Sequence, residues 1–248
     1  DVSGSVDDMI RHSITKLAHI HLPGTEKSAE RIINMGEEPW RVKVVGTPMN
    51  MGAEMRKEDI EKSLGIKLES PVLLVVQHPV TSEAQDAGDQ MEETMKAIVE
   101  LGKTTIVVYP NSDAGNKDMI RIIEKYSNQP FISTYRNIES DIFINLLRNV
   151  DVMIGNSSSG IVEAPFFRLP VVNIGTRQRR RERGDNVIDT GYDRKEIITA
   201  IDKCIDKDWR RGISYNPYSQ ENNPEDNILD FLNNLEINPG LLNKSFEL

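Results

Sequence analysis

The sequence predicts an α/β fold built on a doubly wound parallel sheet of the Rossmann type. Two observations predict it. Apolar runs such as Val72–Gln77 lack the alternation of a half-exposed strand, so both faces of these strands should be covered. Amphipathic segments of helical length separate the runs, which is the pattern of repeated β-α-β units. The regular part of this pattern extends from about Lys57 to Gly212.

The strand predictions rest on short β-rich runs bounded by turn residues. Pro110 ends one such run and Pro48 closely follows another, and proline is disfavoured inside a central strand. Strands are predicted at His19–Leu22, Arg41–Gly46, Val72–Gln77, Thr104–Tyr109, Phe131–Tyr135, Val150–Ile154 and Pro170–Ile174.

The helix predictions rest on amphipathic spacing and on residues suited to helix ends. Thr25 is a good N-cap residue, and Gly65 and Gly102 are good residues to follow a helix. Helices are predicted at Ser5–Ala18, Glu26–Met35, Lys57–Leu64, Ser82–Leu101, Asn116–Tyr126, Glu139–Arg148, Ile161–Phe167, Arg194–Asp206 and Glu225–Leu235.

The composition excludes several classes of protein. The 248 residues are 38% hydrophobic and 28% charged, as in a globular chain with a sizeable core. The longest aliphatic run, Val72–Val76, is far shorter than the roughly 20 residues of a membrane span, so no membrane partner is expected. A net charge of −9 and a pI near 5.1 argue against a general nucleic-acid binder. The single cysteine, Cys204, excludes an intramolecular disulfide and, with no secretory signal visible, favours the cytoplasm.

Polar loops follow the predicted strands. In doubly wound sheets, ligands bind beyond the carboxyl ends of the strands, so these loops should face one cleft. They carry His78, residues 111–115, Arg136, residues 156–160 and residues 175–184.

Residues Gly155–Gly160 lead from a predicted strand into a predicted helix and are small or polar. Such a loop lets backbone N–H groups approach a phosphate closely, and its serine hydroxyls add donors. Glu163 follows one turn later, where a carboxylate can accept from two ribose hydroxyls. The plainer interpretation is a strand-to-helix turn with a capped helix. A P-loop is excluded because no Gly-Lys-Ser/Thr follows.

Residues Gly175–Gly184 carry five arginines and one glutamate. This density of positive charge suits an anionic ligand such as a diphosphate, whereas a solvated charged loop is the plainer interpretation. His78 directly follows a predicted buried strand. A histidine there contacts a phosphate, moves a proton, or is simply structural.

Charged residues also gather near the start, at Asp1, Asp7, Asp8, Arg11 and His12. Asp7 with Arg11, and Asp8 with His12, are spaced four residues apart on one predicted helix. They are either surface ion pairs or an acid/base set whose neighbouring carboxylates differ in pKa.

His19 and His21 would share one face of a predicted strand. No third metal ligand is evident, so both are predicted to be packed residues and no metal site is expected.

Three stretches carry a family resemblance. They are Asp1–His19, which includes Asp-Val-Ser-Gly-Ser-Val-Asp-Asp-Met-Ile-Arg-His, then Asn-Ser-Ser-Ser-Gly-Ile-Val-Glu at Asn156–Glu163, and Gly-Thr-Arg-Gln at Gly175–Gln178 with the later Arg183–Val187. In this order they resemble the hydrolysing UDP-N-acetylglucosamine 2-epimerases. The resemblance covers nearly the whole chain. Within the family, the chain is similar to the enzymes of the sialic-acid pathway.

The resemblance implies the C-terminal half of a glycosyltransferase-B-like fold, in which two Rossmann-like halves close over a UDP-sugar. Residues 1–56 would then be a remnant of the first half, residues 57–214 the UDP-binding half, and residues 215–248 a tail and helix crossing back to the first half. It also implies a homo-oligomer at full length, and little epimerase activity for this chain alone.

The implied reaction abstracts the proton at C2 of the sugar and expels UDP across C1–C2. Water then adds to the 2-acetamidoglucal, which gives N-acetylmannosamine, with no metal or redox cofactor. Asp1, Asp7, Asp8 and His12 would carry the proton transfers. The expected UDP-sugar-binding residues are Arg11, His78, Arg136, Asn156, Ser158, Ser159, Gly160, Glu163, Arg177 and Gln178.

Several alternatives stay open. The Val6-Asp7-Asp8 start favours hydrolysis, because the non-hydrolysing epimerases usually have Pro-Glu-Glu there. A UDP-diacetamido sugar is an alternative substrate. A glycosyltransferase of the same fold would also use Glu163 for ribose but would not need Asp7 and Asp8. The remaining alternative is a UDP-binding fragment without catalysis.

Overall fold

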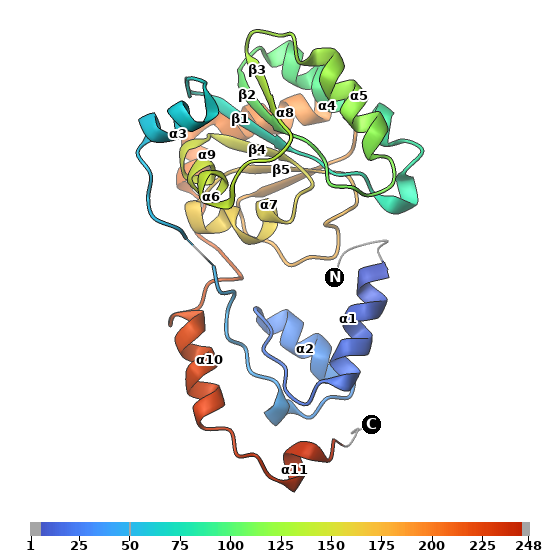
Figure 1. Cartoon of the computed structure of the whole chain (residues 1–248), viewed down its shortest axis with the longest axis vertical. Coiled ribbons are helices and arrows are strands. Elements are labelled where there is room, and N and C mark those ends of the chain that lie inside the picture. Colours follow the sequence, from blue (N-terminus) through green and yellow to red (C-terminus); the bar gives the residue numbers. More distant parts are fainter. Residues whose placement is uncertain (1–5, 50, 245–248) are drawn as a thin grey trace. The chain divides into compact units, whose positions relative to one another are not determined.

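The computed structural model describes residues 6–49 and 51–244 of the chain (Figure 1). The described residues form two compact units. The first unit comprises residues 51–215, and the second comprises residues 6–49 together with residues 216–244.

The first unit is built on a six-stranded parallel sheet with the strand order β3-β2-β1-β4-β5-β6, which confirms the predicted fold class. The register pairs Val76 of β1 with Gly155 of β4, so these central strands end at the same level. The winding reverses between β1 and β4, and such switch points are where doubly wound sheets bind ligands. The strands are β1 (Val72–Val76), β2 (Thr104–Val108), β3 (Ile132–Tyr135), β4 (Val152–Gly155), β5 (Val171–Ile174) and β6 (Val187–Thr190).

Helices cover both faces of this sheet (Figure 1). One face carries α4 (Ala87–Leu101), α5 (Asn116–Tyr126) and α8 (Arg194–Ile205), followed by α9 (Lys207–Arg211). The other carries α6 (Ser140–Asn149), against which α3 (Lys57–Leu64) packs, and α7 (Ser159–Val162) with the 3₁₀ turn Ala164–Phe167. Strand residues such as Leu73, Val107 and Ile154 are fully buried against Met95 and Ile98 of α4. Burial on both faces explains why the strands are apolar without alternation.

The second unit consists of helices and extended segments. Its helices are α1 (Val6–Leu17), α2 (Glu26–Asn34), α10 (Pro224–Asn233) and α11 (Pro239–Leu242). The predicted cap is confirmed, because the hydroxyl of Thr25 accepts from the backbone N–H of Ser28 at the start of α2. Two charged side chains, Glu37 and Arg41, lie in its interior with only 2% and 1% of their surface exposed.

The two strands predicted in this unit do not form. Segments His19–Leu22 and Arg41–Gly46 meet only in one parallel bridge, between His21 and Val42. Pro39 starts a 3₁₀ turn, Pro39–Arg41, that occupies the beginning of the second segment. In the part of the chain that the structure describes, no further strand joins the bridge, so the ladder does not extend.

The first unit also differs from the predictions. The predicted helix Ile161–Phe167 forms instead as α7, Ser159–Val162, and a 3₁₀ turn, Ala164–Phe167. The predicted helix Ser82–Leu101 is split into a 3₁₀ turn, Thr81–Glu83, and α4, which begins only at Ala87. Strand β6 was not predicted at all. It is short, only partly buried and polar at Asp189, so it lacks the apolar run that marks the other strands.

Among the described residues, every helix is too short or too polar to cross a lipid bilayer.

We predict that Gly155→Ala destabilises the first unit by about 2 kcal/mol or more. Gly155 has φ +126°, and a β-carbon there would overlap the backbone carbonyl of Val76. Gly65→Ala is the matched control, because Gly65 has φ +69° with open space around it, and should cost about 1 kcal/mol. Urea unfolding followed by circular dichroism measures both. Equal effects would contradict the close approach of β4 to β1.

Candidate functional site

The site is organised around the ends of β1 and β4, where Asn156 joins two loops. Its side-chain Oδ1 accepts from the backbone N–H of His78 at 2.7 Å, and its Nδ2 donates to the carbonyl of His78 at 2.8 Å. Asn156 is buried, with 1% of its surface exposed. The paired bonds therefore fix the direction in which the chain leaves β1.

The imidazole of His78 is held neutral at this edge. Nδ1 accepts from the backbone N–H of Asn111 at 3.1 Å, so Nε2 carries the proton of the neutral ring. Burial lowers the pKa of His78 to about 4, and the positive charge of Arg177 contributes in the same direction, while Asp113 opposes it. Among the described residues no hydrogen bond engages Nε2, which leaves a donor for an incoming anion.

In the loop Gly155–Gly160, the serines make local hydrogen bonds and the final glycine allows close packing. The hydroxyls of Ser157 and Ser159 lie 2.7 Å apart, within hydrogen-bonding distance. A β-carbon at Gly160 would come within 2.9 Å of Val171 on β5, so this glycine brings α7 close to the sheet. Ser158 stands at the N-cap of α7 without a side-chain capping bond. Gly160 therefore allows close packing of α7 on the sheet, while the hydroxyl of Ser158 makes no capping bond to the helix.

Glu163 follows α7 and carries an unused acceptor. Its Oε2 is buried and has no hydrogen-bond partner among the described residues. Burial raises the pKa of this carboxyl, and its own backbone N–H and the charge of Arg181 only partly oppose the effect. An unsatisfied buried carboxylate oxygen costs free energy, so it is a strong acceptor for a hydroxyl donor that reaches it.

The Thr-Arg-Gln loop is tied to the same asparagine. Arg177 Nη1 and Gln178 Nε2 both donate to the backbone carbonyl of Asn156, at 3.2 and 2.8 Å. Gln178 is fully buried, so it joins the loops after β4 and β5. Arg183 donates in turn to the carbonyl of Gln178 at 2.6 Å. Three loops, after β1, β4 and β5, therefore meet at Asn156.

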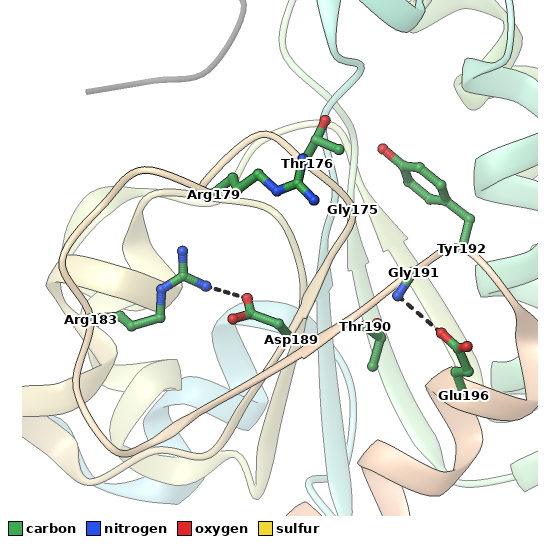
Figure 2. Close-up of a pocket in the computed structure, with 9 residues that line it drawn as sticks. All are labelled: Gly175, Thr176, Arg179, Arg183, Asp189, Thr190, Gly191, Tyr192 and Glu196. Atoms are coloured by element: carbon green, nitrogen blue, oxygen red, sulfur yellow. Dashed lines mark hydrogen bonds and ion pairs between the residues drawn. The ribbon is translucent and has the colours of Figure 1, made fainter.

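A cavity of about 480 Å³ lies beside these loops at the ends of β5 and β6 (Figure 2). Arg179 and Arg183 both line it, but they differ in role. Arg183 is paired with Asp189, whereas Arg179 is exposed at the surface. Asp189 also accepts from Asn173 at 2.7 Å, so the Arg183 pair fixes the loop to the edge of the sheet.

Glu83 is a residue that the sequence reasoning missed. It accepts from Thr176 at 2.5 Å, from the hydroxyl of Tyr192 at 2.6 Å and from Gln90 at 2.9 Å. Burial and this carboxylate raise the pKa of Tyr192. Glu83 thereby anchors the start of the Thr-Arg-Gln loop. No local signal marks it, because its partners are up to 109 residues away.

The remaining predicted site residues are Arg136 in the first unit and the charged residues near the start of the chain. Arg136 is exposed after β3, two strands from β1. Arg11 and His12 are exposed on α1, in the second unit. Asp7 and Asp8 belong to the first turn of α1, but their side chains, like all of Asp1, lie outside the described residues.

Of the two histidines predicted to be packed, His21 is packed, whereas the prediction is wrong for His19, which is exposed because the predicted strand does not form there. His21 is buried and bonds Glu37 through Nε2 at 3.0 Å, and His19 Nε2 lies 3.3 Å from the carbonyl of Leu242. Within the described ranges, no group of three or more His, Cys, Asp or Glu side chains is placed to hold a metal ion.

These features define a Rossmann-like α/β unit whose polar loops converge at the switch point. The family model described as UDP-N-acetylglucosamine 2-epimerase matches residues 1–233, and the chain belongs to this family.

The chain is similar to several characterised proteins. It is 33% identical to a hydrolysing UDP-N,N'-diacetylbacillosamine 2-epimerase of Legionella pneumophila over 98% of this chain and 64% of that protein. It is 36% identical to a UDP-N-acetylglucosamine 2-epimerase of Neisseria meningitidis over 82% of this chain and 55% of that protein. The chain thus spans about three-fifths of the length of these relatives.

The fold is similar to that of solved epimerases. The structure of the Neisseria meningitidis UDP-GlcNAc 2-epimerase bound to UDP-GlcNAc matches with a TM-score of 0.75 and 18% identity, over 94% of this chain and 66% of that chain.

We predict that UDP raises the pKa of His78 from about 4, because a diphosphate beside Nε2 favours the protonated ring. Since the bound pKa is the higher one, UDP affinity should rise as the pH falls through the bound pKa and level off below about 4. NMR titration of the imidazole Cε1–H, with and without saturating UDP, measures this shift. His21, already bonded to Glu37, is the internal control. An unchanged pKa of His78 would exclude contact with the diphosphate.

Proposed function

We propose that the protein is a hydrolysing UDP-N-acetylglucosamine 2-epimerase that releases UDP and N-acetylmannosamine. The proposal rests on family membership together with two groups near the switch point that have no hydrogen-bond partner among the described residues. They are the Nε2–H of His78 and the buried Oε2 of Glu163. The Val6-Asp7-Asp8 start of α1 adds support for hydrolysis.

The first unit would bind the UDP part. The diphosphate would accept from His78 and from the Ser158-Ser159-Gly160 loop, with Arg177 adding positive charge. The carboxylate of Glu163 would accept from the ribose hydroxyls, which would satisfy its Oε2. Gln178 would act by holding the Arg177 loop on Asn156, since its own side chain is buried. Arg136, exposed at the end of β3, would meet the ligand at its periphery.

The chemistry would be carried by the charged set at the start of α1. A carboxylate of Asp1, Asp7 or Asp8 would take the proton from C2 of the sugar. The electron pair would form the C1–C2 double bond as the C1–O bond breaks and UDP leaves. Water would then add across the C1–C2 double bond of the 2-acetamidoglucal. Its oxygen would bond C1, and a proton would be added to C2 on the face opposite to the one that lost its proton, which inverts C2. His12 and Arg11 would assist proton transfer and hold negative charge.

A UDP-diacetamido sugar is the second candidate substrate. It is favoured by the Legionella pneumophila relative, which matches 98% of this chain and is a hydrolysing UDP-N,N'-diacetylbacillosamine 2-epimerase. The elimination and hydration steps would be the same, because the substituent that differs lies away from C1 and C2.

We predict that the whole protein, incubated with UDP-N-acetylglucosamine in D₂O, releases UDP and N-acetylmannosamine deuterated at C2. Solvent deuterium must enter because C2 loses and regains a proton. Proton NMR of the products measures both. Residues 1–248 alone should bind UDP but turn over little, because the curated relatives are longer. UDP release with undeuterated, unchanged sugar would contradict epimerisation. Turnover only of a UDP-diacetamido sugar would select the second substrate.

We also predict that Glu163→Gln raises KM about 10- to 100-fold, because the ribose hydroxyls lose a charged acceptor. The same change should leave the melting temperature unchanged or higher, since it removes an unsatisfied buried carboxylate. Initial rates and thermal unfolding measure the two effects. Glu58→Gln, an exposed residue in the first turn of α3, is the control. A lower melting temperature with unchanged KM would mean that Glu163 is structural.

A further inference from the structure

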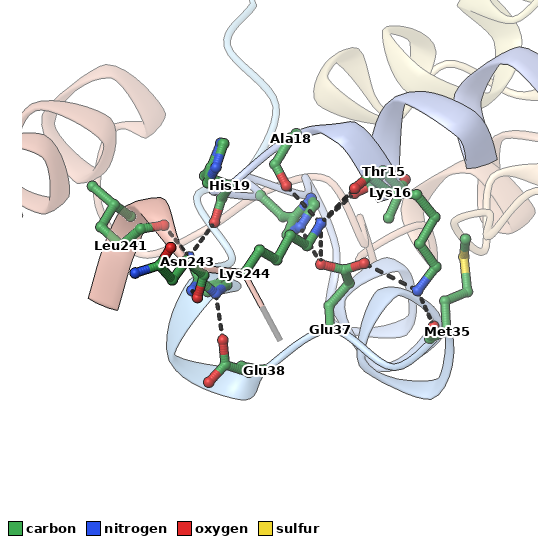
Figure 3. A network of polar contacts seen from close by, with 12 residues as sticks. Thr15, Lys16, Ala18, His19, Met35, Glu37, Glu38, Leu241, Asn243 and Lys244 are labelled. Atoms are coloured by element: carbon green, nitrogen blue, oxygen red, sulfur yellow. Dashed lines mark hydrogen bonds and ion pairs between the residues drawn. The ribbon is translucent and has the colours of Figure 1, made fainter. Parts of the chain in front are cut away.

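The second unit contains a cluster of buried charges that links three segments (Figure 3). Glu37 is its centre, with 2% of the residue exposed. Its carboxylate accepts from Lys16 of α1 at 3.1 Å, from His21 at 3.0 Å and from Lys244 at 2.6 Å. Burial alone would raise the pKa of Glu37, but the bonds from Lys244, Lys16 and His21 outweigh it and hold the pKa below its ordinary value.

The protonation states in this cluster are consistent with one another. Burial lowers the pKa of His21 more than its bond to Glu37 raises it, and the nearby charges of Lys244 and Arg41 also lower it. The ring is therefore neutral near pH 7 and donates from Nε2 to the ionised carboxylate. Two lysines and one neutral histidine thus face a single carboxylate.

Lys244 also closes the end of α1. Its three N–H donors are shared between Glu37 and the backbone carbonyl oxygens of Thr15, Lys16 and Ala18, which lie 2.9, 3.0 and 2.6 Å from Nζ. The carbonyls at the end of a helix have no partners within the helix, and a cation placed there also opposes the negative end of its dipole. Lys16 adds a second tie, because it donates to the carbonyl of Met35, the C-cap of α2.

Arg41 binds the backbone of the segment that precedes Lys244. This guanidinium is 1% exposed and stacks 4.1 Å from the ring centre of Trp40. It donates to the carbonyls of Gly240 at 2.8 Å and Leu241 at 2.9 Å. It also bonds the carboxylate of Glu38 at 2.6 Å. The family match ends at residue 233, so the docked segment lies beyond it.

We propose that Lys244 and Glu37, with Arg41 behind them, are positioning residues that set the direction of α1. The inference rests on the proposed function in one respect, the assignment of the proton transfers to the start of α1. The twelve residues of α1 extend about 18 Å, and the anchored turn is at the opposite end from Asp7 and Asp8. A tilt of about 5° at the anchor moves the far end by roughly 1.5 Å, and a misplacement of about 1 Å costs on the order of 100-fold in rate.

The test compares Lys244→Met with Lys244→Arg and Lys43→Met in the whole protein. Methionine keeps most of the apolar stem and removes the donors, and arginine restores donors. Lys43 is an exposed lysine of the same unit and gives a matched control. The first measurement is amide hydrogen exchange of α1 relative to α2. Lys244→Met should raise exchange in α1 about tenfold more than in α2. Lys244→Arg should largely reverse the change, and Lys43→Met should have none. Equal acceleration in α1 and α2, or none, would overturn the proposal.

The second measurement is turnover of UDP-N-acetylglucosamine well below the melting temperature. Lys244→Met should lower kcat about 10- to 100-fold with KM changed less than about threefold, because the proposed UDP contacts lie in the first unit. Lys244→Arg should recover most of kcat. Unchanged kcat with a loosened α1 would overturn the positioning role. Failure of the proposed function would instead show as absent C2 exchange in the unaltered protein, and the hydrogen-exchange test would still decide whether Lys244 fixes α1.

Discussion

The first unit depends on one side chain, the amide of Asn156, which bonds both the N–H and the carbonyl of His78. At the switch point the chain continues from β1 to α4 on one face of the sheet and from β4 to α7 on the other, so the loops beyond these two paired strands need a tie of their own. Asn156 provides it, and its backbone carbonyl receives the side chains of Arg177 and Gln178. Because the amide of Asn156 is buried, any other arrangement of the loops would leave it without hydrogen-bond partners. The free-energy cost of that loss strongly favours the observed arrangement.

The groups left open by this arrangement are the ones a nucleotide diphosphate would use. The amide of Asn156 places His78 so that Nδ1 is occupied by Asn111 and Nε2–H is available. Glu163 keeps a buried acceptor without a partner among the described residues. The desolvated carboxylate of Glu163 costs stability in the free protein near pH 7, and the desolvated imidazole of His78 costs stability when it is protonated. Costs of this kind gather at binding sites, where the ligand relieves them.

Different interactions stabilise the interiors of the two units. Aliphatic side chains from β1, β2 and β4 meet α4 in an apolar core. The second unit instead buries Glu37 and Arg41 and satisfies each with several hydrogen bonds. Buried charges are strongly destabilising when a partner is removed, so this unit tolerates few changes at its polar centre. The apolar unit provides a rigid edge for a ligand, and the polar unit provides a sharply defined helix end.

The sequence predicted much of the first unit because its signals are local. Apolar runs marked β1, β2 and β4, and Gly65 and Gly102 ended helices in the left-handed conformation expected of them. The half-exposed strand β6 gave no such run. The Asn156–His78 bonds join residues 78 apart, and the roles of Glu83 and Glu37 depend on distant partners. Nothing local marks such groups, so only the fold reveals them.

We propose that the edge formed by β1, β4 and β5 binds the diphosphate of UDP. Titration of UDP into the ¹⁵N-labelled protein, followed by amide chemical shifts, tests it most directly. We expect the largest shifts at His78, in the loop Asn156–Gly160 and at Glu163, with α9 and the turn before β1 unaffected. Shifts concentrated at that opposite edge of the sheet, with His78 and Asn156 unchanged, would contradict it.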